Sequence, residues 1–366
     1  MPSWRQMASF TDVDRAGDLV IPPDAVTIDA AGATVVSGIR DNHVHPVFGD
    51  FTPRQNTVGW IDACLHGGVT TMYSAGEPHL PGRPSDPTGV KVLAILAHRS
   101  FAKARLSGVK VHAGAVLLEQ GLVEADFDDL AAAGCRLVGE AGISGITNPA
   151  DAARMVRWAQ ARGMKVMVHT GGASIPGISV IGPDFVAEVR PDITGHVNGG
   201  STSLSLSDVA RILDESDACV KIVHNGNITM LGKIVGIVHE LGELDRLVAG
   251  TDCPAGSGVQ PLGMLRVMAS AASLGGIDCP TAMAIATGNV AQLHDDPNGR
   301  IPSERRQTCS SWTRRSGHRR TQPWPPSRSP TPSPLPSLLS RVGWLSPKAG
   351  TRRRLPEISG GLTRPP

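Results

Sequence analysis

Short apolar runs alternate with amphipathic stretches over most of this chain. The apolar runs are rich in β-branched residues and fall at 34–45, 69–75, 109–118, 135–141, 165–170, 192–198, 219–225 and 247–253. The stretches between them carry apolar residues at helical spacing, for example at 62–66, 149–162, 207–215 and 228–241. Buried strands that alternate with amphipathic helices are typical of parallel βα units.

The number of these units distinguishes two α/β architectures. Eight βα units in roughly 240 residues fit a (β/α)8 TIM barrel, and an open doubly wound sheet is the alternative. Residues that commonly bind metals stand at strand ends along the series, and barrel active sites lie at the C-terminal ends of the strands. The sequence therefore predicts a closed barrel over residues 33–300.

The first apolar run ends in His43-Val44-His45. Residues two apart in a strand point to the same face, about 7 Å apart, so these imidazoles can bind one cation. Alone, this pattern is weak. Four later strands strengthen it, because each ends in a residue type that binds metals: Glu140, His169, His196 and Asp252.

The composition of this set predicts two metal ions rather than one. Four histidines and two carboxylates exceed the three protein ligands of a single catalytic zinc, and they suit two divalent ions about 3.5–4 Å apart. We expect two ligand sets that share Glu140: His43, His45 and Asp252 around one ion, and His169 and His196 around the other. The ions would activate a bridging hydroxide, and Asp252 would pass its proton to the leaving nitrogen.

The order of these residues along the chain resembles the pattern of the amidohydrolase superfamily. That pattern has two histidines on the first strand, an acid on the fourth, histidines on the fifth and sixth, and an aspartate on the eighth. Within this superfamily, the segments 65–72, 78–84, 169–177 and 196–200 are similar to those of enamidases, the cyclic-amide hydrolases of nicotinate catabolism. The similarity runs from about residue 28 to 300. The resemblance implies a barrel of the metal-dependent hydrolase type. It also implies an enzyme that converts 6-oxo-1,4,5,6-tetrahydronicotinate to 2-formylglutarate and ammonia.

The resemblance also implies the bridging ligand and the metals. Enamidases bridge with a glutamate, which Glu140 matches, whereas dihydropyrimidinases and dihydroorotases use a carboxylated lysine. The implied cofactors are two divalent metal ions per chain, zinc or iron or both, since imidazole suits either metal. Two alternatives stay open. One is another amidohydrolase with a single metal, such as an imidazolonepropionase-like hydrolase or a deaminase, and the other is a defective barrel without catalysis.

A small anionic substrate requires a cation or a hydrogen-bond donor near the mouth of the barrel. His79, Arg83 and Arg54 lie in loops or just after strands and are candidates to bind it, although solvated loop residues are equally expected there. His224 ends a strand-like run and is a further candidate. The commoner role for such a histidine is a structural hydrogen bond at the strand end.

Charge is divided unevenly along the chain. Residues 302–366 hold 12 Arg, 1 Lys and 2 Glu, which gives them a net charge of +11. The whole chain has a net charge of +2, so residues 1–301 have a net charge of −9. An acidic body argues against binding to nucleic acid. The cysteines are scattered, and neither a signal peptide nor an apolar run of about 20 residues is found. We therefore expect a cytoplasmic enzyme that binds no membrane and, when correctly folded, forms a homo-oligomer.

The two ends of the chain depart from the expected pattern. In amidohydrolases both termini build a small β-sandwich beside the barrel, and residues 1–32 resemble only a remnant of its N-terminal strands. Residues 301–366 hold 12 of the 29 prolines and almost no acid, a composition typical of disorder. We expect a frameshift after Ile301. A basic binding arm and a proline-rich ligand segment are the alternatives.

Overall fold

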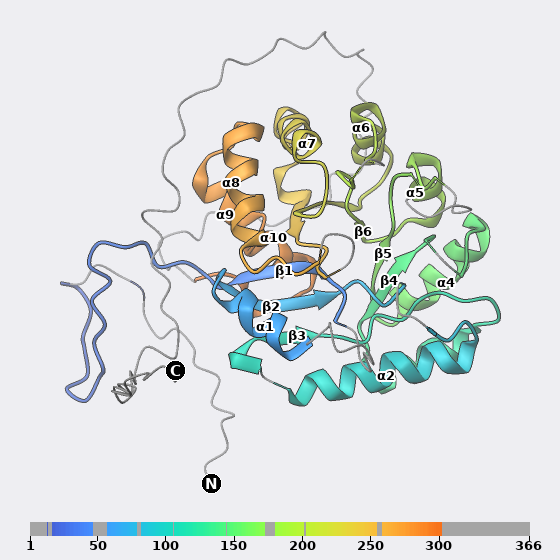
Figure 1. The fold of residues 1–366 in the computed structure, drawn as a ribbon, viewed down its shortest axis with the longest axis horizontal. Coiled ribbons are helices and arrows are strands. Elements are labelled where there is room, and N and C mark those ends of the chain that lie inside the picture. Colours follow the sequence, from blue (N-terminus) through green and yellow to red (C-terminus); the bar gives the residue numbers. More distant parts are fainter. Residues whose placement is uncertain are drawn as a thin grey trace, which may run out of the picture.

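Eight parallel strands form the inner wall of the molecule in this computed structural model (Figure 1). The structure describes residue 13 and residues 17–46, 57–78, 82–104, 106–143, 145–172, 180–200, 203–254 and 258–301. The strands are β1 (Ile39–Val44), β2 (Val69–Ser74), β3 (Lys110–His112), β4 (Leu137–Ala141), β5 (Lys165–Val168), β6 (Ile193–Thr194), β7 (Cys219–Val223) and β8 (Leu247–Gly250). Each overlaps one of the apolar runs of the sequence.

The strands follow one another around the wall in the order of the sequence. β1, β2 and β3 form one sheet, β4 to β8 form a second one, and all neighbours are parallel. Isolated parallel bridges close both seams: Val116 pairs with Val138 between β3 and β4, and Val44 pairs with Cys253 beyond β8. The wall is therefore a closed (β/α)8 barrel, as predicted, and not an open doubly wound sheet.

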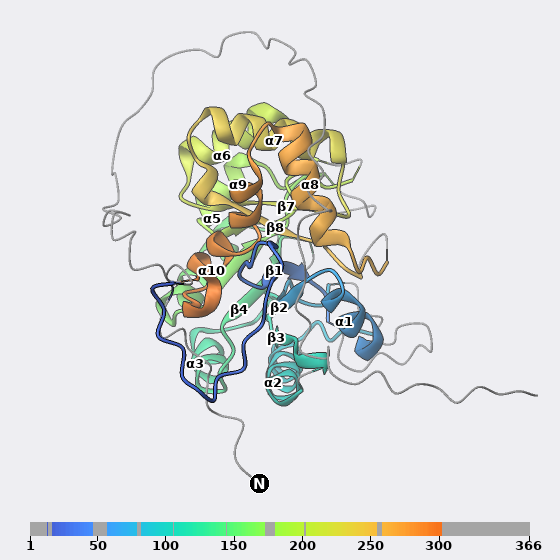
Figure 2. The same ribbon diagram turned by 90° about the vertical axis from the view of Figure 1, so that its left-hand side faces the viewer.

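A layer of helices surrounds the strands, as Figures 1 and 2 show from two directions. The helices are α1 (Thr57–Leu65), α2 (Pro87–Lys103), α3 (Glu124–Ala132), α4 (Pro149–Ala161), α5 (Pro183–Val189), α6 (Leu206–Glu215), α7 (Ile228–Glu240), α8 (Gly263–Gly275), α9 (Cys279–Ala284) and α10 (Gly288–Leu293). Several begin at a side chain that accepts a hydrogen bond from the first turn, and these caps are Asp86, Asn148, Ser205, Asn227 and Asp278. Such caps satisfy N–H groups that a helix leaves unpaired.

β3 and β6 are the strands that fall furthest short, in proportion, of the apolar runs that predicted them. The run 192–198 forms only Ile193–Thr194, because the backbone turns at His196, where φ is 32°. The run 109–118 forms only Lys110–His112, and β2 instead approaches β4, where Glu140 N donates to Ala75 O at 2.9 Å. Gly139 permits this approach, because a Cβ there would lie 2.5 Å from Ala75 O.

The segment after α9 closes the end of the barrel at which β1 and β8 begin. The ring of His294 stacks on Tyr73 of β2 with centroids 3.8 Å apart, and its Nε2 lies 2.6 Å from Asn42 Oδ1. Arg40 of β1 pairs with Asp296 at 3.0 Å, and their side chains are 3% and 8% exposed. This segment therefore holds β1 in place at the end of the barrel opposite the candidate ligands, the first of which β1 carries.

The predicted domain boundaries at the two ends stay predictions. The described part of the N-terminal region, residue 13 and residues 17–38, contains no strand. Of the predicted C-terminal tail, 301–366, only Ile301 belongs to the described residues. The frameshift hypothesis and its alternatives fall on that part of the chain.

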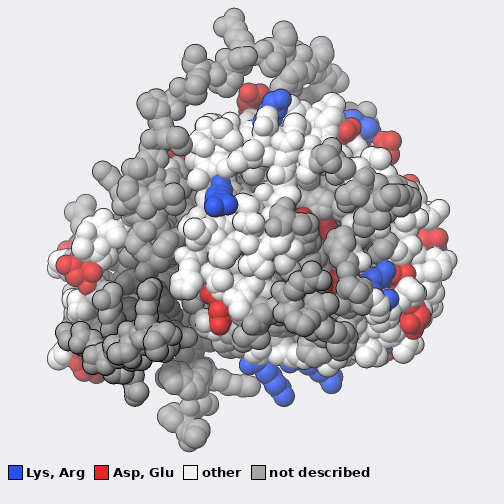
Figure 3. All heavy atoms as spheres, in the orientation of Figure 1, with Lys and Arg blue, Asp and Glu red and all other residues white. Residues whose placement is uncertain are grey.

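Charged side chains are dispersed over the face shown in Figure 3, where Lys and Arg gather in no broad patch on the described surface. The longest of the described helices, α2, has 17 residues. None of them combines the length and the apolar character that a membrane-spanning helix requires.

Replacing Arg40 with methionine should destabilise the barrel. The change removes the ionic partner of the Asp296 carboxylate, to which Tyr73 and Asn298 still donate, and such a loss typically costs about 1–3 kcal/mol of unfolding free energy. Arg211→Met is the matched control, because Arg211 pairs with Glu215 and Asp184 at the surface, where a pair contributes about 0–1 kcal/mol. Urea denaturation of the full chain measures both variants, and equal losses would contradict this account of the barrel base.

Candidate metal centre

The predicted ligands meet at the C-terminal ends of the strands. Five strands place the six side chains: His43 and His45 by β1, Glu140 by β4, His169 by β5, His196 by β6 and Asp252 by β8. Because the strands are parallel, these ends lie at one mouth of the barrel. The structure therefore brings the whole predicted set together.

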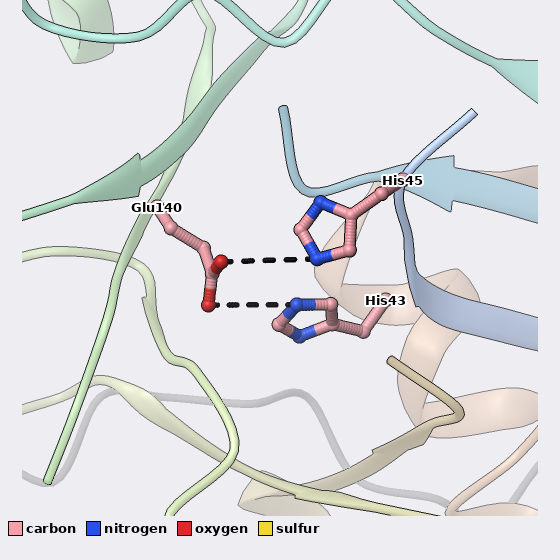
Figure 4. A group of neighbouring side chains, drawn as sticks. All are labelled: His43, His45 and Glu140. Carbon is pink, nitrogen blue, oxygen red and sulfur yellow. Dashed lines mark ion pairs between the residues drawn. The ribbon is translucent and has the colours of Figure 1, made fainter. Parts of the chain in front are cut away.

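Glu140 lies at the centre of the group. Figure 4 shows its carboxylate facing the rings of His43 and His45 from across the barrel, with Oε1 3.5 Å from His43 Nε2 and Oε2 3.8 Å from His45 Nε2. Oε1 also lies 2.8 Å from His196 Nε2 and 3.5 Å from His169 Nδ1. Two sets of three potential ligands share this carboxylate, and within each set the ligand atoms lie within 4.8 Å of one another.

The chemistry of this donor set fits divalent cations. Glu140 is 2% exposed, and the four histidines are at most 8% exposed. Within the described structure, three polar atoms that lie toward the cluster make no hydrogen bond of acceptable geometry: His43 Nε2, His169 Nδ1 and Glu140 Oε1. Unpaired buried polar atoms are costly, and a cation that they face removes this cost. His45 Nδ1 contacts Gly76 O at 2.7 Å, which leaves its Nε2 toward the cluster.

The charges of two central residues are those that metal ligands require. Burial lowers the pKa of His43 well below its usual value, so the ring is neutral. Burial acts to raise the pKa of Glu140, but the surrounding histidines, among them His196, whose own pKa is raised, outweigh burial and hold the pKa of Glu140 well below its usual range. A neutral imidazole and an ionised carboxylate are the forms that bind metal.

Asp252 completes the group from the last strand. Its Oδ1 lies 3.1 Å from His45 Nε2 and 3.5 Å from His43 Nε2. Its side chain is 20% exposed, whereas that of Glu140 is 1% exposed. Asp252 is therefore the member of the set that a small molecule in the barrel mouth reaches most directly.

Asp41 is a buried acid that sequence reasoning missed. Its carboxylate accepts hydrogen bonds from Thr251 N at 2.8 Å, from Thr251 Oγ1 at 2.6 Å and from His43 N at 3.2 Å. It thereby ties β1 to the residue before Asp252. Burial raises the pKa of Asp41 to about 6, and these hydrogen bonds oppose the rise. The available signal was an acid in an apolar run, at even spacing from both histidines and so on their face.

Lys221 adds a cation to the interior of the barrel and was also missed. It is fully buried on β7, where Nζ donates to Asn42 O at 2.6 Å and lies 3.0 Å from Met167 Sδ. Burial lowers the pKa of Lys221 to about 7, against the attraction of Glu140 and Asp41. A lysine within the apolar run 219–223 was the signal for an interior charge.

A pocket beside the cluster contains one of the substrate-binding candidates. Arg83 lines this small open pocket of about 20 Å³, together with Pro46, which follows His45. Nη1 of Arg83 is paired with Glu119 at 2.5 Å, so the guanidinium already has an anionic partner. Glu77, which sequence reasoning missed, lines the same pocket, and burial raises its pKa to about 8.

Of the other candidates for substrate binding, only His224 belongs to the described residues. His224 lies just after β7, and its Nδ1 contacts Asn225 Oδ1 at 3.0 Å. His79 and Arg54 lie outside the described residues. All four residues therefore stay predictions as substrate ligands.

Comparisons with known proteins point to one group. The chain is 50% identical over 271 residues to the enamidase of Eubacterium barkeri, a match over 74% of this chain and 70% of that protein. A crystal structure of enamidase, described as a new member of the amidohydrolase superfamily, has a TM-score of 0.70 at 47% identity, over 74% of this chain and 72% of that one. A β-aspartyl dipeptidase from Fervidobacterium islandicum, at 17% identity and a TM-score of 0.56 over 79% of this chain and 81% of that one, shows the fold alone. No model of a protein family matches the chain.

Glu140→Gln should lower the metal content of the purified protein. A neutral amide cannot offset the repulsion between two cations, whereas the carboxylate can. Glu119→Gln is the control, because Glu119 is also buried but pairs with Arg83 outside the cluster. Elemental analysis gives the ions bound per chain, and a Glu140→Gln variant that matches the unmodified protein would contradict the bridging role.

Proposed function

The chain belongs to the amidohydrolase superfamily as a relative of enamidase, and on this premise we propose that it hydrolyses a C–N bond of a cyclic amide with two divalent ions. The superfamily is metal-dependent, and the described histidines and Glu140 provide the ligands. Zinc and iron both suit such imidazole-rich sites. We assign His43, His45 and Asp252 to one ion, His169 and His196 to the other, and Glu140 to both.

The observation that carries this proposal is the carboxylate shared by two pairs of histidines. Glu140 contributes to both sets of potential ligands, and no lysine is needed between them. An amidohydrolase or deaminase with one metal would require only one of these sets. The second set therefore favours the hydrolase with two ions over that alternative.

Asp252 is the residue that we assign to proton transfer. When bound, the ions act as Lewis acids toward the amide carbonyl and the attacking water. Asp252 accepts a proton from that water as the new C–O bond forms, and donates it to the ring nitrogen as the C–N bond breaks. Its partial exposure and its position 3.1 Å from His45 Nε2 suit this role at the edge of the cluster.

Two polar residues hold the histidines of the second set in place. Thr170, next to His169, donates from Oγ1 to Gly195 O at 2.5 Å, and Gly195 precedes His196. Asn198 then bonds the backbone of Val223 with both ends of its amide, at 3.0 and 2.8 Å. These bonds substitute for strand pairing where β6 has already ended, and they orient the rings that would bind the ion.

We propose 6-oxo-1,4,5,6-tetrahydronicotinate as the substrate. Opening of the ring amide consumes one water and yields a carboxylate and an enamine. A second water converts the enamine to the aldehyde of 2-formylglutarate and releases ammonia. The substrate carboxylate requires a donor at the mouth, and Arg83 in the adjacent pocket supplies one if it exchanges its bond to Glu119. A cytoplasmic homo-oligomer remains our expectation for location and assembly.

Turnover by the full chain loaded with zinc or iron tests this assignment. Tetrahydro-oxonicotinate should be consumed with release of ammonia. The same ring without its carboxylate, 3,4-dihydropyridin-2-one, should show a much higher KM because it lacks the charge that is recognised. Protein that holds two ions and opens neither ring, or both rings equally well, would overturn the proposed substrate.

Asp252→Asn should reduce kcat by about 10²–10⁴-fold, because an amide cannot accept the proton of the attacking water. Asp192→Asn is the control, because the Asp192 carboxylate accepts a hydrogen bond from Val166 N at 2.9 Å, near the start of β5. Steady-state kinetics on metal-loaded protein measures both. A loss of less than about tenfold would rule out Asp252 as the proton carrier.

A further inference from the structure

Asp252 has a backbone conformation that most residues avoid, although aspartate tolerates it better than most. Its φ is 63°, in the left-handed region that glycine adopts readily and most other residues avoid. Such a conformation persists only where neighbouring groups hold it. The groups that hold Asp252 therefore decide where its carboxylate points.

The peptide on the N-terminal side of Asp252 is held by β1. Asp252 N donates to His43 O at 2.8 Å. The preceding residue, Thr251, donates to Asp41 from both its backbone and its hydroxyl group. These contacts fix where the chain enters residue 252.

The peptide on the C-terminal side is held by a side chain that follows β7. Asn225 Nδ2 donates to Asp252 O at 2.7 Å. Asn225 N donates to Thr251 O at 3.1 Å, so its backbone is also anchored to the segment that it supports. The amide of Asn225 thus fixes where the chain leaves residue 252.

His224 determines which way that amide faces. Nδ1 of His224 lies 3.0 Å from Asn225 Oδ1, and His224 N donates to Gly250 O at 3.1 Å. With the proton on Nδ1, the ring donates to that oxygen, and the NH2 group of Asn225 faces Asp252 O. A chain of contacts therefore runs from His224 through Asn225 to Asp252.

We propose that Asn225 is a positioning residue for the hydrolysis, which holds Asp252 in the left-handed conformation that aims its carboxylate at His45 and His43. His224 acts through Asn225 by orienting its amide, rather than by binding substrate. The inference rests on the proposed function, because it concerns the residue assigned there to proton transfer. Loss of the Asn225 donor frees the peptide after Asp252 to rotate and lets the carboxylate leave the cluster.

Asn225→Asp tests the donor with little change of shape, because it keeps an oxygen toward His224 and replaces the NH2 group with an acceptor. In the full chain loaded with zinc, we expect kcat for tetrahydro-oxonicotinate to fall by about 10–100-fold, while KM changes little. We expect fewer zinc ions per chain at limiting zinc, and a crystal structure of the variant in which φ of residue 252 is negative.

Asn289→Ala is the matched control. Asn289 Nδ2 donates to Leu244 O at 2.8 Å and to Leu247 O at 2.9 Å, so it holds backbone carbonyls at the other end of β8. This variant should lose stability in urea denaturation but keep its kcat and its zinc content. The comparison separates a general weakening of β8 from the loss of a specific backbone position at Asp252.

His224→Ala supplies an independent variant. It should lower kcat less than Asn225→Asp does, and the double variant should be no slower than Asn225→Asp alone, because both residues act through one contact. If Asn225→Asp does not fold, His224→Ala decides the question, since the inference requires it to lower kcat with KM for tetrahydro-oxonicotinate little changed.

Three results would overturn the inference: an Asn225→Asp variant with unchanged kcat and zinc content, an unchanged backbone at residue 252, or effects of the two residues that simply add. If the unmodified protein opens neither ring, the proposed function fails instead. The zinc content and the backbone conformation of residue 252 then still decide the role of Asn225.

Discussion

The hydrogen bonds between the C-terminal end of β1 and the residues just after β8 are the constraint on which the rest of the structure depends. Asp252 N donates to His43 O, and His45 N donates to Cys253 O, both at 2.8 Å. Asp41 adds its bonds to Thr251, which is 210 residues further along the chain. The complete set of six ligands exists only when this seam is closed, because its first two histidines and its last carboxylate come from opposite ends of the barrel sequence. Glu140, His169 and His196 stand on or just after neighbouring strands, and closure of the wall adds the other three to them.

The sequence reveals those parts of the site that follow from local periodicity. His43 and His45 share a face because strands repeat every two residues, and Glu140 and His169 meet them because parallel strands end at one mouth. Asn225 is defined instead by a partner 27 residues away, and no local pattern marks it. Lys221 stands out as a charge in an apolar run, but its partner lies 179 residues away. The early end of β6 escaped prediction for a similar reason, since the turn at His196 is sustained by bonds to a neighbouring strand.

The interior of this barrel is more polar than the layers of branched apolar residues that usually fill such a barrel. Asp41, Lys221 and Glu140 lie inside the wall with almost no exposure. Buried charges of opposite sign offset one another but rarely stabilise a fold more than apolar side chains would. The stability of the molecule therefore resides mainly in the apolar layer between strands and helices, where Phe127 and Ile212 lie. The interior is left free to specify the positions of the ligands.

Glu140 has a consequence for how the site is supplied. A lysine at the bridging position becomes a carboxylate only by reacting with carbon dioxide, so a centre of that kind depends on dissolved bicarbonate. The carboxylate of Glu140 is present as soon as the chain is synthesised, and it lies buried among four imidazoles. With Glu140 as the proposed bridging ligand, assembly of the centre would require metal ions but no carbon dioxide.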